Sequence, residues 1–299
     1  MINAENVVKS FDGFRALDGL NMNVEKGSIY GLVGPNGAGK TTIINHLTGA
    51  LRPDSGTITI DGENTYGNEN LHKKVLSIAD DWFFYGSFTV RDTARFFESI
   101  YPDFNKDRYK KMEALFNIDP RRQIRRLSKG MKKQVAFHMV MSCMPEVLIL
   151  DEPLDGLDPV MRKQILNLII TDVAERGMTT LVSSHNLREL EDICDHVGII
   201  HKGKMIVEKP LDDLKGSVHK YQVVFDGTYP KELDMQLDIL HKSHIGSVYS
   251  LIIKGKDDEI DAAFKNYAPK VCEKVSLTLE EVFIYELGGL GYDFKGILL

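Results

Sequence analysis

Apolar positions in the first two-thirds of the chain fall into short runs separated by segments with helical spacing. The runs predict strands at residues 28–33, 57–60, 147–150 and 180–183, and the last two suit a buried parallel sheet. Helical spacing predicts helices at residues 42–47, 90–100, 108–116, 160–176 and 187–194. Strands and helices that alternate in this way indicate an α/β fold with a parallel sheet core and a mainly helical insert around residues 90–116.

The pattern changes after about Pro210. Residues 221–225 and 247–254 predict strands, and residues 231–240 and 257–267 predict helices. We therefore expect two domains, a larger one at residues 1–214 and a small accessory α/β domain at residues 215–299.

Charge and cysteine content narrow the class of protein. The 299 residues carry 37 Lys and Arg against 43 Asp and Glu, a formal charge of −6, so no nucleic acid partner is expected. Cys143, Cys194 and Cys272 form no CxxC pair and are typical of reduced, mostly buried thiols in the cytosol. There is no signal-peptide pattern and no apolar run long enough to cross a bilayer, so work at a membrane is expected to go through a partner.

Residues 34–41 fit the phosphate-binding pattern GxxxxGK[ST], between a predicted strand and a predicted helix. The glycines let successive backbone N–H groups wrap a phosphate, and the helix N-terminus adds partial positive charge. Lys40 is placed to bridge the β- and γ-phosphates, and Thr41 to ligate Mg²⁺. A Gly-rich turn that binds nothing is disfavoured because the flanking elements also match. The nucleotide-binding residues expected here are Gly34, Asn36, Gly37, Gly39, Lys40, Thr41 and Thr42.

Four further residues, at three places in the chain, carry candidate chemistry. Asp151 and Glu152 end an apolar strand, where ligands of open α/β sheets bind; Asp151 would hold Mg²⁺ and Glu152 would activate the attacking water. The alternative is an acidic strand end that faces solvent. Ser128 is a helix N-cap whose free N–H groups and hydroxyl could bind an anion. His185 follows a strand beside two serines, which favours a γ-phosphate contact over a packed or surface histidine.

In this order, these motifs resemble the nucleotide-binding domain of ABC transporters over roughly the first 210 residues. The resemblance implies a P-loop NTPase core with antiparallel N-terminal strands and ATP with Mg²⁺ as cofactors. It also implies a head-to-tail dimer, in which ATP on one phosphate loop is completed by the partner's LSGGQ-type signature. Ser128 and Gly130 match that signature, Asp158 belongs to a segment similar to the D-loop, and His185 matches the switch histidine. Phe11 falls where an aromatic ring stacks on adenine, although a core aromatic is the alternative and Phe14 lies close by.

Three departures from the family pattern stand out. The signature reads LSKGM, so Lys129 replaces a glycine and Met131 a glutamine. Asp80 stands where the Q-loop has glutamine; its carboxylate could ligate Mg²⁺ but would repel the γ-phosphate. Asp155 occupies a D-loop position that is commonly serine.

The resemblance also implies partners: membrane permease subunits and a second cassette, identical or different, with the protein cytoplasmic and peripheral on the inner face of the membrane. The aromatic run at residues 82–85 is the expected permease contact, against local packing as the alternative. Residues 276–283 resemble the end of single-cassette bacterial drug and lantibiotic exporter subunits, and residues 129–134 and 289–292 are similar to the YtrB-like branch. The apolar tail 287–299 is expected to dock on its own or a neighbouring subunit.

Two other readings stay open: a soluble ABC ATPase that acts on ribosomes or DNA, and an importer ATPase subunit. A single phosphate loop and the lack of a long coiled-coil insertion disfavour the first. The helical insert and the C-terminal segment favour export over import.

Overall fold

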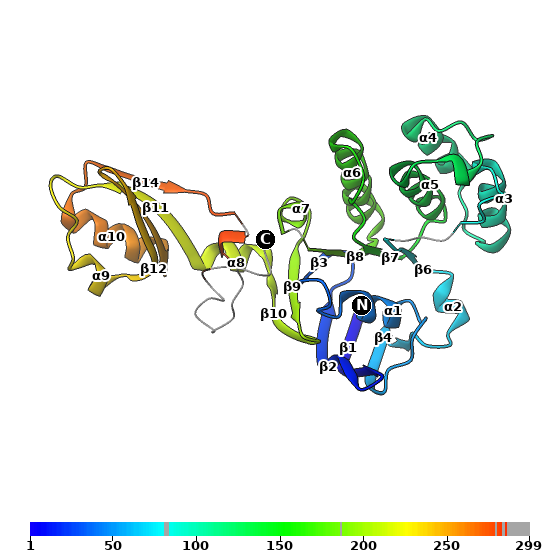
Figure 1. The fold of residues 1–299 in the computed structure, drawn as a ribbon, viewed down its shortest axis with the longest axis horizontal. Coiled ribbons are helices and arrows are strands. Elements are labelled where there is room, and N and C mark those ends of the chain that lie inside the picture. The colour runs from blue at the N-terminus through cyan, green and yellow to red at the C-terminus, as the bar shows by residue number, and fades with distance from the viewer. Residues whose placement is uncertain (81–83, 186, 279, 283–284, 286–299) are drawn as a thin grey trace. The chain divides into compact units, whose positions relative to one another are not determined.

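The computed structural model describes residues 1–80, 84–185, 187–278, 280–282 and 285 (Figure 1). The chain forms two compact units, Met1–His185 with Ile193–Glu208, and Asn186–Asp192 with Lys209–Leu299. The predicted domain border at residue 214 stays a prediction. Each unit is described by itself.

A six-stranded sheet forms the centre of the first unit, in the order β10-β9-β3-β8-β7-β6. The neighbours from β9 to β6 pair in parallel. Every residue of β3, β7 and β8 is buried, as expected of strands covered on both faces. The strands are β3 (Ile29–Val33), β6 (Val75–Ile78), β7 (Val147–Asp151), β8 (Thr179–Ser184), β9 (His196–His201) and β10 (Lys204–Pro210).

A second, antiparallel sheet packs on this core in the order β2-β1-β4-β5. Its long hairpin turns at Asp12 and Gly13, both at positive φ, so that Phe11 and Phe14 face each other as its last pair. One hydrophobic cluster joins the hairpin to β3 and to α1 (Lys40–Leu47). The strands are β1 (Ile2–Phe11), β2 (Phe14–Val24), β4 (Ser55–Ile60) and β5 (Glu63–Asn64).

The helices between β6 and β7 gather at one end of this unit (Figure 1). Thr89 and Asp92 form a reciprocal capping box that starts α3, and Asn105 caps α4. Arg108 of α4 donates to the buried Asp172 of α6 (Pro159–Arg176) at 2.6 Å, which ties the insert to the core. The elements are α2 (Glu69–His72, before β6), α3 (Val90–Ile100), α4 (Lys106–Phe116), η1 (Ile124–Arg126) and α5 (Lys129–Ser142). The predicted fold class, with N-terminal antiparallel strands and a helical insert, is confirmed.

The second unit holds a four-stranded antiparallel sheet in the order β12-β13-β11-β14. Ile260 and Phe264 of α10 pack with Tyr221, Leu251 and Ile253 of the sheet. The strands are β11 (Val218–Val224), β12 (Asp238–Ile245), β13 (Val248–Lys254) and β14 (Val271–Val275); the helices are α7 (Leu187–Glu191), α8 (Leu211–Ser217), α9 (Leu233–Gln236) and α10 (Asp257–Tyr267).

Two helix predictions need correction in this unit. The helix predicted at residues 231–240 is wrong beyond the single turn of α9, because residues 238–245 form β12 and pair with β13. The helix predicted at residues 187–194 ends at Glu191. Residues 82, 83 and 286–299, where part of the expected permease contact and the apolar tail fall, lie outside the described residues. Within the described part of the chain, every helix is too short or too polar to cross a membrane.

Candidate nucleotide-binding and hydrolysis site

The phosphate-binding loop runs from the end of β3 at Val33 to the start of α1 at Lys40. A Cβ on Gly34 would lie 2.3 Å from the carbonyl oxygen of Ile200, so packing excludes any side chain there. Gly39 has φ of +112° and its Cβ would lie 2.8 Å from the Ala16 carbonyl oxygen. The backbone of this loop therefore depends on glycine at both positions.

Lys40 is buried within the loop. Its Nζ donates to the carbonyl oxygen of Gly34 at 2.6 Å and lies 3.4 Å from Oε1 of Glu152. These contacts hold the ammonium over the loop, where it can neutralise the charge of a phosphate.

Asp151 joins the loop to the parallel sheet. Its Oδ2 accepts from the hydroxyl of Thr41 at 2.8 Å, and its Oδ1 accepts from the hydroxyl of Ser183 at 2.5 Å. A hydroxyl and a carboxylate oxygen side by side are the hard oxygen ligands that Mg²⁺ takes. The donor set therefore fits the metal predicted for Thr41 and Asp151.

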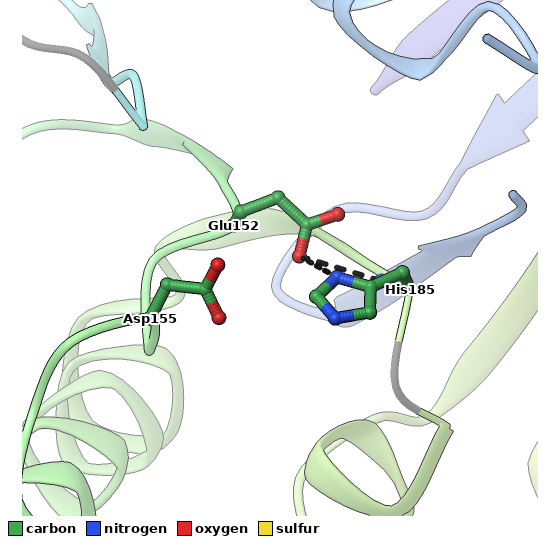
Figure 2. A group of neighbouring side chains, drawn as sticks. All are labelled: Glu152, Asp155 and His185. Carbon is green, nitrogen blue, oxygen red and sulfur yellow. Dashed lines mark hydrogen bonds and ion pairs between the residues drawn. The ribbon is translucent and has the colours of Figure 1, made fainter. Parts of the chain in front are cut away.

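Glu152 follows with an unusual backbone, since its φ of +46° lies in the left-handed region. Its N–H donates to Oγ of Ser183 at 3.1 Å. Its Oε2 accepts from the N–H of His185 at 3.3 Å and lies 2.8 Å from the His185 ring Nδ1 (Figure 2). The carboxylate is thus held between Lys40 and His185.

Asp155 completes a small group with Glu152 and His185 (Figure 2). Each offers one ligand atom, and these atoms lie within 4.8 Å of one another, so among the described residues this group could hold a metal ion. Two carboxylates and an imidazole would suit a transition metal. In the structure, however, the His185 ring bonds Glu152 directly, which gives that carboxylate a partner without a metal.

A pocket of about 390 Å³ gathers most of the predicted site. Phe11 and Phe14 line it and are 43% and 66% exposed, so Phe11 is not a core aromatic. Predicted residues on its wall are Phe11, Asn36, Gly37, Gly39, Lys40, Thr41, Thr42, Asp80, Asp151 and Glu152.

Ser128, Gly130 and Asp158 stand apart from this pocket. The hydroxyl of Ser128 caps α5 by accepting from the N–H of Met131 at 3.2 Å, and Asp158 caps α6. A Cβ on Gly130 would lie 2.5 Å from the carbonyl oxygen of Gly156, so the signature segment packs tightly on the D-loop segment. Their part in binding nucleotide stays a prediction.

Asp80 lines the pocket, but its Oδ1 lies 3.1 Å from Nζ of Lys129 and 3.3 Å from Nζ of Lys133. Burial raises the pKa of Asp80, but hydrogen bonds from the two lysines outweigh this effect and lower the pKa below its usual value. The sequence analysis did not identify Lys133 as a partner of Asp80. Its position one helical turn after Lys129 was the feature that could have indicated it. The sequence analysis also missed the role of Ser183, although it noted the two serines before His185.

The chain is similar to known proteins both in sequence and in structure. The family described as "ABC transporter" matches residues 17–155. The chain is 31% identical over 289 residues to the ABC transporter ATP-binding protein YtrB of Bacillus subtilis (strain 168), covering 97% of this chain and 99% of that protein. It is 33% identical over 302 residues to the bacitracin transport ATP-binding protein BcrA of Bacillus licheniformis, covering 97% and 98%. A solved structure described as the ATP binding subunit of an ABC transporter is 26% identical, with a TM-score of 0.67 over 72% of this chain and 92% of that one.

The fold and the near-full-length relatives agree with the resemblance stated from the motifs, including its similarity to the YtrB-like branch. The chain belongs to the ATP-binding proteins of ABC transporters, a family of ATP-hydrolysing cassettes.

Proposed function

We propose that this cassette closes head-to-tail on a second cassette around ATP and thereby drives export through a separate membrane permease. One observation carries the proposal. The phosphate loop and the Asp151–Glu152 pair line the nucleotide pocket, whereas Ser128 and Gly130 do not. The signature of a second cassette would supply the missing wall.

The residues of this chain divide the work of hydrolysis. Phe11 stacks on adenine, and Lys40 with the loop N–H groups holds the phosphates. Thr41 and Asp151 would hold Mg²⁺, which when bound neutralises charge on the β- and γ-phosphates. Glu152 orients the attacking water and accepts its proton, and His185 fixes the Glu152 carboxylate beside the γ-phosphate.

Export through a separate permease rests on two supports. The bacitracin transport protein aligns with almost the whole chain, including the C-terminal unit that follows the cassette core. The segment at residues 276–283 resembles the end of single-cassette exporter subunits. The chain would then sit on the inner face of the cell membrane, bound to permease subunits.

The test compares the wild type with Glu152→Gln. ATP hydrolysis is measured against protein concentration, with light scattering in parallel. Hydrolysis per molecule should rise with concentration, and Glu152→Gln should dimerise on ATP without hydrolysing it. ATP binding with no dimer at any concentration would refute closure of two identical copies and point to a different second cassette.

Membrane fractionation tests the partner. The chain should pellet with membranes only when a candidate permease is co-expressed. Sedimentation with ribosomes or DNA in the absence of a permease would overturn the proposal in favour of the other class of ATPase. Measuring whether membrane vesicles take up or release a transported compound distinguishes import from export.

A further inference from the structure

Lys133 is a buried cation in contact with the backbone of Glu152, the proposed catalytic residue. Its side chain is 3% exposed. Its Nζ donates to the carbonyl oxygen of Glu152 at 2.7 Å, to that of Asp155 at 3.2 Å and to Oδ1 of Asp80 at 3.3 Å. An ammonium has three donors, so these three acceptors match its capacity. A lysine is buried in this way only where such partners offset the loss of hydration.

The contact to Glu152 acts on a strained backbone. The left-handed φ of Glu152 is unfavourable for a residue with a side chain and persists only where its surroundings fix it. Here its N–H is held by Ser183 and its carbonyl by Lys133. The two bonds together fix the peptide groups on both sides of the Glu152 Cα, and so the direction in which its carboxylate leaves the strand.

Asp80 supplies the charge that balances Lys133. The same carboxylate oxygen also pairs with Lys129, which is four residues earlier on α5. Asp80 therefore forms ion pairs with two lysines on one face of this helix. Asp80 lines the nucleotide pocket and also a neighbouring pocket of about 160 Å³ that contains Lys129, Lys132 and Lys133. The acid therefore connects the nucleotide side of the site to the signature helix within one chain.

We propose that Lys133 is a positioning residue for Glu152, and that Asp80 is its counter-ion rather than a Mg²⁺ ligand. This inference rests on the proposed role of Glu152 in hydrolysis. In this chain the Q-loop position and the signature segment are coupled by a direct ion pair. Loss of the pair should loosen the catalytic carboxylate without removing any group that touches ATP.

The first test compares Lys133→Met with Lys133→Gln in the full chain. Lys133→Met should lower kcat by about tenfold or more and change KM for ATP by less than about threefold, because the carboxylate is misplaced while the phosphate loop is intact. Lys133→Gln keeps a donor and should recover part of kcat. Lys132→Met is the matched control, since it removes an adjacent lysine charge from the same helix and should stay within about twofold of wild type.

The second test is a double-mutant cycle between Asp80→Asn and Lys133→Met. If the two residues act as a pair, Asp80→Asn should lower kcat in the wild type and have little further effect in Lys133→Met. The Mg²⁺ concentration for half-maximal hydrolysis should be unchanged in Asp80→Asn. Additive effects, or a severalfold rise in the Mg²⁺ requirement, would overturn the assignment.

Controls separate the possible failures. If Glu152→Gln hydrolyses ATP like the wild type, the proposed role of Glu152 fails and this inference fails with it. If Glu152→Gln is inactive but Lys133→Met keeps full kcat, only this inference is overturned. Binding of a fluorescent ATP analogue shows whether each variant keeps a folded phosphate loop; if Lys133→Met does not fold, Lys133→Gln and Asp80→Asn decide the question by the same split between kcat and KM.

Discussion

The hydroxyl of Thr41 lies 2.8 Å from the carboxylate of Asp151, although 110 positions separate the two residues in the chain. The contact exists because Thr41 is in the first turn of α1, which begins after β3, while Asp151 ends β7, and β8 lies between these two strands in the sheet. Parallel strands place their carboxyl ends at one edge, so both oxygens reach the same point.

This pair gives the first prediction. Asp151→Asn should lower ATP hydrolysis by about 100-fold or more, because the charge that would balance Mg²⁺ is lost. Thr41→Ala should raise the Mg²⁺ concentration needed for half-maximal hydrolysis, and Thr41→Ser, which keeps the hydroxyl, should not. A magnesium titration of hydrolysis measures both effects, and equal behaviour of Ala and Ser at position 41 would contradict the assignment.

The second prediction concerns the two phenylalanines of the hairpin. Phe11→Ala should weaken ATP binding by about 5- to 160-fold, as expected for loss of a stacking partner worth about 1–3 kcal/mol per base. Phe14→Ala should have the smaller effect, since Phe14 is the more exposed ring and Phe11 has the ammonium of Lys9 5.6 Å from its centroid. Titration of a fluorescent nucleotide gives both constants; Phe11→Trp should bind like wild type, and a larger loss in Phe14→Ala would transfer the role to that residue.

The third prediction concerns His138 and pH. Burial lowers the pKa of His138 from 6.5 to about 4, against a hydrogen bond between its Nε2 and the carbonyl oxygen of Tyr109. Below pH 6.5, His138 binds a proton in the unfolded chain but stays neutral in the folded chain. The free energy of unfolding therefore falls as pH drops from 6.5 towards 4. The total decrease in the free energy of unfolding from this one group is about 3 kcal/mol.

Thermal unfolding at a series of pH values checks this. The Tm of the wild type should fall over that interval more steeply than the Tm of His138→Gln, which starts lower at pH 8 because the ring stacked on Tyr109 is lost. Parallel curves would show that His138 already binds its proton in the folded state.

The fourth prediction concerns thiol reactivity. Cys143 and Cys194 are buried and Cys272 is exposed. Burial raises the pKa of the Cys143 thiol to about 12 and raises that of Cys194 further. An alkylating reagent at pH 8 should therefore modify Cys272 in the folded protein and reach the other two only after denaturation, because thiolate is the reactive form. Mass spectrometry before and after denaturation counts the labels, and rapid native labelling of Cys194 would contradict the packing around it.

The sequence predicted elements best where local signals agree with the tertiary structure. Helices α3 and α10 begin and end at the predicted residues; a Thr89 capping box opens the first, and acidic residues fill the first turn of the second. Strands β12 and β14 were missed because most of their residues are exposed, so their sequences show no buried apolar run, and the strands are defined by pairing with β13 and β11.

The same distinction applies to the site. Motif spacing was enough to name the phosphate-loop residues, Asp151 and Glu152 on the pocket wall, because a strand end and a helix start fix their positions, whereas Phe11 and Asp80 were named from the family resemblance. The Asp80 ion pairs could not be read from the sequence, since they depend on how α5 lies against the end of β6. The metal role predicted for Asp80 rests on its place in the family pattern, which carries no information about its lysine neighbours, and it stays a prediction.

The packing of Gly130 against Gly156 limits which residues the signature segment can hold. A methyl group at position 130 has no space, because the Gly156 carbonyl already occupies it. The Lys129 side chain pairs with Asp80, and the Met131 side chain is only partly buried. The two departures in LSKGM thus fall on neighbours of the glycine, while the glycine itself is retained. The Gly156 carbonyl thus acts as a steric filter at position 130 alone, while the positions on either side of the glycine accommodate longer side chains in this chain.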